Sequence, residues 1–244
     1  NLLTEKSKEL KEQLIKNGAK FILSYFDENS LDDSRWFSGH ENVRKQYGNL
    51  LENLLKDNSL GLILKPKAAS TLFYRLGPVA EILQKALNTG RCFLFQSEGI
   101  QYPPAIAALA SDLAIHSHVT AVTAALEASL SGTPTVMFDC DKIYKSRFYS
   151  NGENKLVFSS MDEFWCILDK HRKSKNGIKG LGDWSKLIEE IDPFRDGLAA
   201  NRMGTYLKWL IEDLDRGVKR DEAMYNAKSL YEKKWGKDKI LSLN

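Results

Sequence analysis

Two kinds of hydrophobic pattern alternate along residues 1–140 of the chain. Short runs of consecutive apolar residues are typical of strands buried on both faces, whereas apolar residues that recur every three or four positions indicate helices. The predicted strands are 20–26, 60–64, 91–95, 113–115 and 134–138. The predicted helices are 2–18, 39–57, one that is kinked at Gly77-Pro78 and ends near 88, a short one after 104, and 120–130.

Strands that alternate with helices in this way form βαβ units with parallel strands. We therefore predict an α/β protein with a Rossmann-like, doubly wound parallel sheet and a helical C-terminal tail. Ligands of such sheets bind beyond the carboxyl ends of the strands. This rule points to the loops that follow Phe26, Leu64, Phe95 and Ile115.

After residue 139 the pattern changes. A weak strand at 155–158 and a helix at 160–170 are followed by a polar, glycine-rich loop at 173–182. The rest of the chain is predicted to be helical, in the segments 184–190, 198–214 and 219–236.

Composition narrows the classes of protein that fit. The 244 residues are 43% hydrophobic and 27% charged, with a net charge of +3. These values are ordinary for a globular chain, and the positive charge is too small to indicate a nucleic-acid partner. No apolar run approaches the roughly 18 residues of a membrane-spanning helix. The three widely spaced cysteines favour free thiols in a reducing, cytoplasmic setting, and no Cys/His cluster indicates a metal.

A candidate phosphate site lies between residues 110 and 139. Small polar residues follow the predicted strand 113–115, and a helix is predicted to start immediately afterwards, at Thr120. Hydroxyls and free backbone N–H groups at a helix N-terminus favour phosphate. Glu127 would lie about two turns into this helix, within reach of two ribose hydroxyls. The residues alone leave an equal alternative, in which Thr120 caps the helix and Glu127 is a solvated acid.

A second candidate is the turn Lys65-Pro66-Lys67, which follows the predicted strand 60–64 and lies at the same edge of the sheet. Two lysines at this place would neutralise a diphosphate or a departing nucleotide. Alternatively, both lysines are solvated turn residues.

The stretch 112–136 resembles the donor-binding half of the GT-B glycosyltransferases. The matching positions are Asp112, Ser117, Thr120, Thr123, Glu127, Gly132, Pro134 and Val136. The resemblance implies phosphate contacts from Ser117, His118, Val119 and Thr120, and a ribose contact from Glu127. Residues 192–210 resemble, more loosely, the tail of bacterial polysaccharide-biosynthesis transferases.

The resemblance also extends to the loops after the second and third strands. In capsule- and teichoic-acid-type transferases a His-Pro turn occupies the place of Lys65-Pro66, so the role of that histidine does not carry over. In GT-B enzymes the loop after the third strand holds the nucleobase. The matching residues here are Ser97, Glu98, Gly99 and Tyr102.

The resemblance implies a bacterial transferase that moves a sugar from a nucleotide-activated donor to a growing polysaccharide or glycoconjugate. We expect three parts: a linker helix (1–18), a Rossmann-like nucleotide-sugar-binding domain (19–172) and a helical extension that packs on it (173–244). The glycan acceptor would bind to an N-terminal domain outside this sequence. We therefore expect the given sequence to be a fragment of a longer protein. The chain would then be inactive alone, and no catalytic residue is assigned.

The remaining expectations concern ligands and location. The nucleotide sugar is the substrate, and neither a cofactor, a metal nor a nucleic acid is expected. The protein is expected in the cytoplasm or at the inner face of the membrane, and peripheral membrane association of the full protein is left open. Two alternatives remain: an enzyme that resembles the nucleotide-sugar 2-epimerases, and a non-catalytic α/β interaction module.

Overall fold

The computed structural model describes residues 2–32, 39–96, 102–151 and 154–239. The chain divides into two compact units, Asn1–Trp184 and Ser185–Asn244. The sequence suggested a boundary at 172/173, and the two units of the structure meet at Trp184 and Ser185. The first helix, which the sequence suggested as a linker, is part of the first unit.

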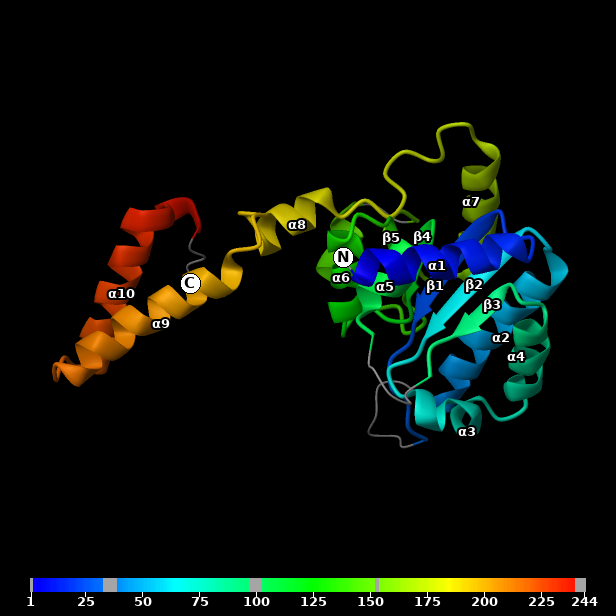
Figure 1. Ribbon diagram of the computed structural model, residues 1–244, viewed down its shortest axis with the longest axis horizontal. Helices are drawn as coiled ribbons and strands as arrows, with labels where there is room; N and C mark the ends of the chain where they lie inside the picture. The colour runs from blue at the N-terminus through cyan, green and yellow to red at the C-terminus, as the bar shows by residue number, and fades with distance from the viewer. Residues whose placement is uncertain (1, 33–38, 97–101, 152–153, 240–244) are drawn as a thin grey trace. The chain divides into compact units, whose positions relative to one another are not determined.

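The first unit is built around a parallel sheet (Figure 1). Its described strands are β1 (Phe21–Phe26), β2 (Leu60–Lys65), β3 (Cys92–Leu94), β4 (Leu113–His116), β5 (Thr135–Phe138) and β6 (Val157–Phe158). They lie in the order β3-β2-β1-β4-β5-β6, and each described pair is parallel. The order reverses between β1 and β4. The predicted Rossmann-like, doubly wound fold is confirmed.

Helices cover both faces of this sheet. They are α1 (Leu2–Lys16), α2 (His40–Lys56), α3 (Leu72–Leu76), α4 (Val79–Asn88), α5 (Pro104–Leu109), α6 (Thr123–Leu130) and α7 (Met161–Lys173), with short 3₁₀ helices at Ala69–Thr71 and Arg147–Asn151. The predicted kinked helix is two helices, because Gly77 between α3 and α4 takes a positive φ of +51°.

Alternate residues of β1 reach opposite faces of the sheet, which explains why its sequence is mostly apolar and does not alternate with exposed polar residues. Leu23 and Tyr25 belong to the core formed with α2, α3, α4 and α7. Ile22 and Phe26 belong to the core formed with α1, α5 and α6. Helix α1 takes part through its buried stripe, which includes Leu10 and Leu14.

The second unit contains α8 (Ser185–Ile191), α9 (Ala199–Asp215) and α10 (Arg220–Trp235), followed by a 3₁₀ turn at Lys237–Lys239. The small buried residues Ala223 and Ala227 let α10 approach α9, and the rings of Trp209 and Trp235 lie 5.6 Å apart. The predicted helical tail is confirmed. Within the described ranges, no helix has both the length and the apolar character needed to cross a membrane.

Gly61 of β2 lies close against the residues at the start of β1. A Cβ at this position would lie 2.9 Å from the Cβ of Ala19 and 3.0 Å from Cγ1 of Ile22. We predict that Gly61→Ala lowers the free energy of unfolding by about 1–3 kcal/mol, as overpacking does in other cores. Chemical denaturation measures this change.

The matched control is Gly48→Ala in α2. A Cβ there would meet Val79 at 3.8 Å, an ordinary van der Waals distance, and alanine favours the helix by roughly 0.5–1 kcal/mol. Equal stability of the two variants would show that the Gly61 contact is not tight.

Candidate functional site

The carboxyl edge of the sheet holds a cavity of about 220 Å³. Its walls come from the ends of β1 and β2 and from helices α5 and α6, and they consist of Phe26, Asp27, Glu28, Lys65, Pro66, Lys67, Pro104, Thr123, Ala124 and Glu127. The cavity therefore lies beside the point where the strand order reverses, the place at which doubly wound sheets bind ligands. The predicted phosphate-binding Lys65 and Lys67 and the predicted ribose-binding Glu127 meet here.

The two lysines have different surroundings. Lys65 is half-buried, and this burial lowers its pKa although the charges of Glu127 and Asp27 oppose the effect. Its Nζ lies 5.7 Å from the centroid of the Phe95 ring. Among the residues that the structure describes, no acid lies within ion-pair distance of Lys65. Lys67 Nζ, by contrast, lies 2.7 Å from Glu28 Oε2.

Glu127 lies about one turn into α6, because the helix begins at Thr123 and not at the predicted Thr120. Its Oε1 accepts a hydrogen bond of 3.0 Å from the backbone N of Ala105, in the first turn of α5. The carboxylate thus joins two helices at the wall of the cavity.

Asp27 was not singled out in the sequence, although it directly follows a predicted strand. Its side chain is fully buried and forms an ion pair of 3.0 Å with Arg75 of α3. It also accepts hydrogen bonds from the Tyr47 hydroxyl (3.1 Å) and the Lys67 backbone N (2.6 Å). Burial raises the pKa of Asp27, although Arg75 and these hydrogen bonds oppose that shift.

Glu28 was likewise missed, and it belongs to a second buried group. Its Oε2 contacts Lys67, and its Oε1 lies 3.4 Å from His116 Nε2. Burial raises the pKa of Glu28, but the interactions with His116 and Lys67 outweigh burial and lower it overall. The rule that ligands bind beyond strand ends pointed to this loop, but the sequence does not distinguish a buried carboxylate from a solvated one.

The four residues predicted to contact phosphate after β4 do not line the cavity. Ser117 Oγ accepts a hydrogen bond of 3.0 Å from the Glu28 backbone N. His118 Nε2 lies 2.7 Å from Asp141, and its Nδ1 accepts from the backbone N of Thr120 at 3.1 Å. Val119 is buried. These contacts hold the chain between β4 and α6, and the position before α6 is Val122, which makes no side-chain cap.

The predicted nucleobase residues divide into two groups. Ser97, Glu98 and Gly99 lie outside the described residues. Tyr102 lines a second pocket, of about 190 Å³, between α1, β3 and α5. Its walls are Lys6, Glu9, Leu10, Gln13, Phe93, Phe95, Tyr102 and Ile106.

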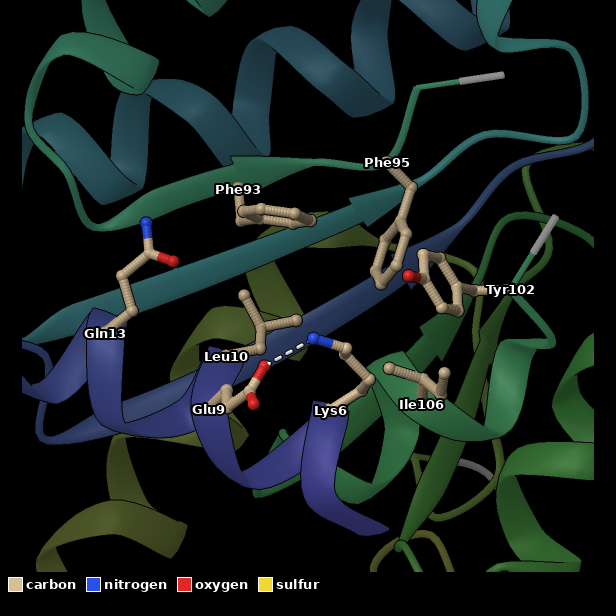
Figure 2. A pocket seen from close by; sticks show the side chains of 8 residues that line it. All are labelled: Lys6, Glu9, Leu10, Gln13, Phe93, Phe95, Tyr102 and Ile106. Carbon is tan, nitrogen blue, oxygen red and sulfur yellow. Dashed lines mark hydrogen bonds and ion pairs between the residues drawn. The ribbon is translucent and has the colours of Figure 1, made fainter. Parts of the chain in front are cut away.

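This aromatic pocket is shown in Figure 2. The rings of Phe93 and Phe95 come from the β3 end of the sheet, and Tyr102 lies beside Phe95 with ring centroids 6.0 Å apart. Helix α1 supplies the opposite wall, where Lys6 and Glu9 form an ion pair of 2.8 Å. Lys65 contacts Phe95 and lines the cavity described above, so the aromatic pocket and the cavity adjoin each other.

The carboxylates of the cavity are already engaged by protein groups. Asp27 is paired with Arg75, Glu28 with Lys67, and Glu127 with a backbone N–H. Within the described part of the chain, no three His, Cys, Asp or Glu side chains are grouped so that they could hold a metal ion.

Comparison of the chain with protein-family models, with curated proteins and with solved structures found no match in any of the three searches.

The buried pair of Asp27 and Arg75 gives a test of the frame behind the cavity. We predict that Arg75→Met lowers the free energy of unfolding by about 3–5 kcal/mol, because it leaves a buried carboxylate without its cation. Lys45→Met, which breaks an exposed pair with Glu41 on α2, should leave the free energy of unfolding close to that of the wild type. Urea denaturation of both variants provides the comparison.

The effect of Arg75→Met should depend on pH. Without Arg75, the pKa of Asp27 rises further above its value in the unfolded chain, so the folded variant binds a proton more readily than the unfolded one. The stability gap to the wild type is therefore largest above the raised pKa. The gap narrows as the pH falls through this raised pKa of Asp27. A gap that is small, or the same at every pH, would contradict the importance of this pair.

Proposed function

We propose that this chain is the donor-binding half of a GT-B-type glycosyltransferase, which transfers a sugar from a nucleotide-activated donor to a growing polysaccharide or glycoconjugate. The observation that carries this proposal is the cavity at the carboxyl edge of the doubly wound sheet. There, two lysines from one turn lie with a carboxylate from α6 beside the reversal of strand order.

The lysines fit the phosphates of such a donor. Lys65 is half-buried and has no acidic partner among the described residues, so an anion would supply the missing counter-charge. Lys67 is 58% exposed and can meet a ligand from solvent. The first turn of α6 contributes Thr123 and Ala124 to the wall, and N–H groups in a first helical turn lack intrahelical acceptors.

Other residues suit the ribose and the nucleobase, the two remaining parts of a nucleotide. The Glu127 carboxylate can accept hydrogen bonds from ribose hydroxyls at the wall of the cavity. The nucleobase fits the adjoining pocket with Phe93, Phe95 and Tyr102, whose rings favour a flat aromatic ligand. At about 190 Å³ this pocket is below the roughly 300–1,000 Å³ of sites for drug-sized ligands, so it suits a single ring system.

In the proposed chemistry, this chain binds the leaving group, which is the nucleotide with its phosphates. As the bond between the sugar and the donor phosphate breaks, negative charge develops on the phosphate oxygens. Lys65 and Lys67 stabilise this charge. The acceptor and the group that removes its proton are assigned to a separate N-terminal domain, so the chain alone binds nucleotide and does not transfer.

Nucleotide binding is the first test. We predict that one class among UDP, GDP, CDP, CMP and ADP raises the thermal transition of the chain, since ligands of the folded state stabilise it by mass action. Lys65→Met and Lys67→Met should each weaken the binding of that nucleotide about tenfold to a hundredfold, the usual size of a charged hydrogen bond. Titration calorimetry measures the loss.

The control for these variants is Lys85→Met, which removes an exposed lysine of α4 that lines neither the cavity nor the aromatic pocket. Its affinity should equal that of the wild type. If no nucleotide stabilises the wild-type chain, the donor-binding function is excluded in favour of a non-catalytic module.

The role of Glu127 has a separate test. Because its carboxylate is proposed to accept from ribose hydroxyls, the wild type should bind a ribonucleotide about tenfold more tightly than its 2′,3′-dideoxy counterpart. Glu127→Ala should bind both equally, at the weaker affinity. If the variant keeps the preference for the ribonucleotide, Glu127 does not contact the ribose, whatever its effect on the α5–α6 contact.

A further inference from the structure

Lys67, which the proposed function assigns to phosphate, is occupied by a carboxylate in the free protein. Its Nζ lies 2.7 Å from Glu28 Oε2, and both groups line the cavity. An ammonium group has three donors, so it can contact two anions at once. Two anions held on one ammonium nevertheless repel each other, most strongly where water is partly excluded. A phosphate therefore competes with Glu28 for Lys67.

The charges of the cavity make this competition stronger. The positive side chains Lys65 and Lys67 are matched by the negative Glu28 and Glu127. Behind them, Asp27 and Arg75 form another balanced pair. A nucleoside diphosphate brings at least two negative charges into this space. The cavity accommodates them better if one of its own carboxylates gains a proton.

One of these carboxylates faces a group with which it can share a proton. His116 is fully buried, and its Nε2 lies 3.4 Å from Glu28 Oε1 without forming a hydrogen bond. The other ring nitrogen, Nδ1, lies 2.8 Å from the carbonyl oxygen of His118 and 3.3 Å from the backbone N of the same residue, so both of its contacts are with the turn after β4. Nε2 is then the nitrogen that can exchange a proton with Glu28.

We propose that Glu28 holds Lys67 in the free protein, that the phosphates of the donor displace it, and that the released carboxylate takes up a proton shared with His116. The inference rests on the proposed function, because the displacing group is the donor phosphate. The proton comes from solvent and lies between Oε1 and Nε2, where it joins the carboxylate to a buried nitrogen that makes no hydrogen bond in the free protein. Glu28 thereby determines the affinity for phosphate and makes it depend on pH.

Lys67 is the cation that links the pair of Glu28 and His116 to a bound phosphate. The charged or titratable side chains around the pair are Asp27 on the same loop, Lys65 and Lys67 after β2, Arg75 on α3, His118 after β4 and Glu127 on α6. Among the described residues, Lys67 is the cation within hydrogen-bond distance of the Glu28 carboxylate, whereas Arg75 reaches its backbone oxygen. Losing Lys67 removes one of the two interactions that lower the pKa of Glu28.

Calorimetry of the nucleoside diphosphate that stabilises the chain most tests the displacement. Titrations in buffers of different ionisation enthalpy give the number of protons bound with the ligand. The wild type should take up protons, so its affinity should be higher in titrations at about pH 5 than in titrations at about pH 8. Glu28→Gln keeps the shape and cannot take the proton. It should show less uptake and bind about fivefold more tightly at the upper end of this range.

The matched control is Glu41→Gln, which removes an exposed carboxylate paired with Lys45 on α2. It should retain the proton uptake and the pH dependence of the wild type. Equal proton uptake by Glu28→Gln and the wild type would overturn the proposal, because any protons would then come from the nucleotide or from another residue.

A second measurement needs no nucleotide. Titration of the Glu28 carboxyl by ¹³C NMR in the free protein should show a higher pKa in Lys67→Met than in the wild type. Lys65→Met, which removes a lysine from the same cavity without a bond to Glu28, should leave it unchanged. An unchanged pKa of Glu28 in Lys67→Met overturns the inference. If that pKa rises but no nucleotide binds, the proposed function fails and the displacement fails with it.

Discussion

The ion pair between Asp27 and Arg75 is the constraint on which the rest of the site depends. A buried carboxylate must have a cation and hydrogen-bond donors around it, and here these come from α3, α2 and the turn after β2. The same guanidinium bonds to the carbonyl oxygens of Glu28 and Ala68. One pair thus fixes the loops after β1 and β2 against each other, and with them the places of Glu28 and Lys67.

Most of the sheet and of the helices that cover it could be predicted from the sequence. Strands β1, β2 and β4 are covered on both faces, so their sequences are mostly apolar and their positions could be predicted. The start of α6 could not be predicted. His118 Nδ1 accepts a hydrogen bond from the backbone N of Thr120, and the helix begins only at Thr123. That contact depends on the side chain folding back on its own loop, which leaves no periodic signal.

The candidate site was predictable in part, and for a similar reason. Lys65 and Lys67 follow a strand, and a pair of lysines at a strand end is conspicuous in a sequence. Asp27 and Glu28 also follow a strand, but acids are common in solvated loops and their burial depends on Arg75 and His116, which are distant in the chain. The aromatic pocket combines β3, α1 and Tyr102, so only the folded chain reveals it.

The hydrogen bond from Ala105 N to Glu127 has a consequence for cooperativity within the site. Glu127 belongs to the wall of the cavity, whereas the first turn of α5 also carries Ile106, a wall of the aromatic pocket. A ligand group that takes the Glu127 oxygen from Ala105 loosens that turn, and a ring that packs against Ile106 steadies it. If ligands occupy both spaces, each would therefore change the affinity of the other, by the same factor in both directions.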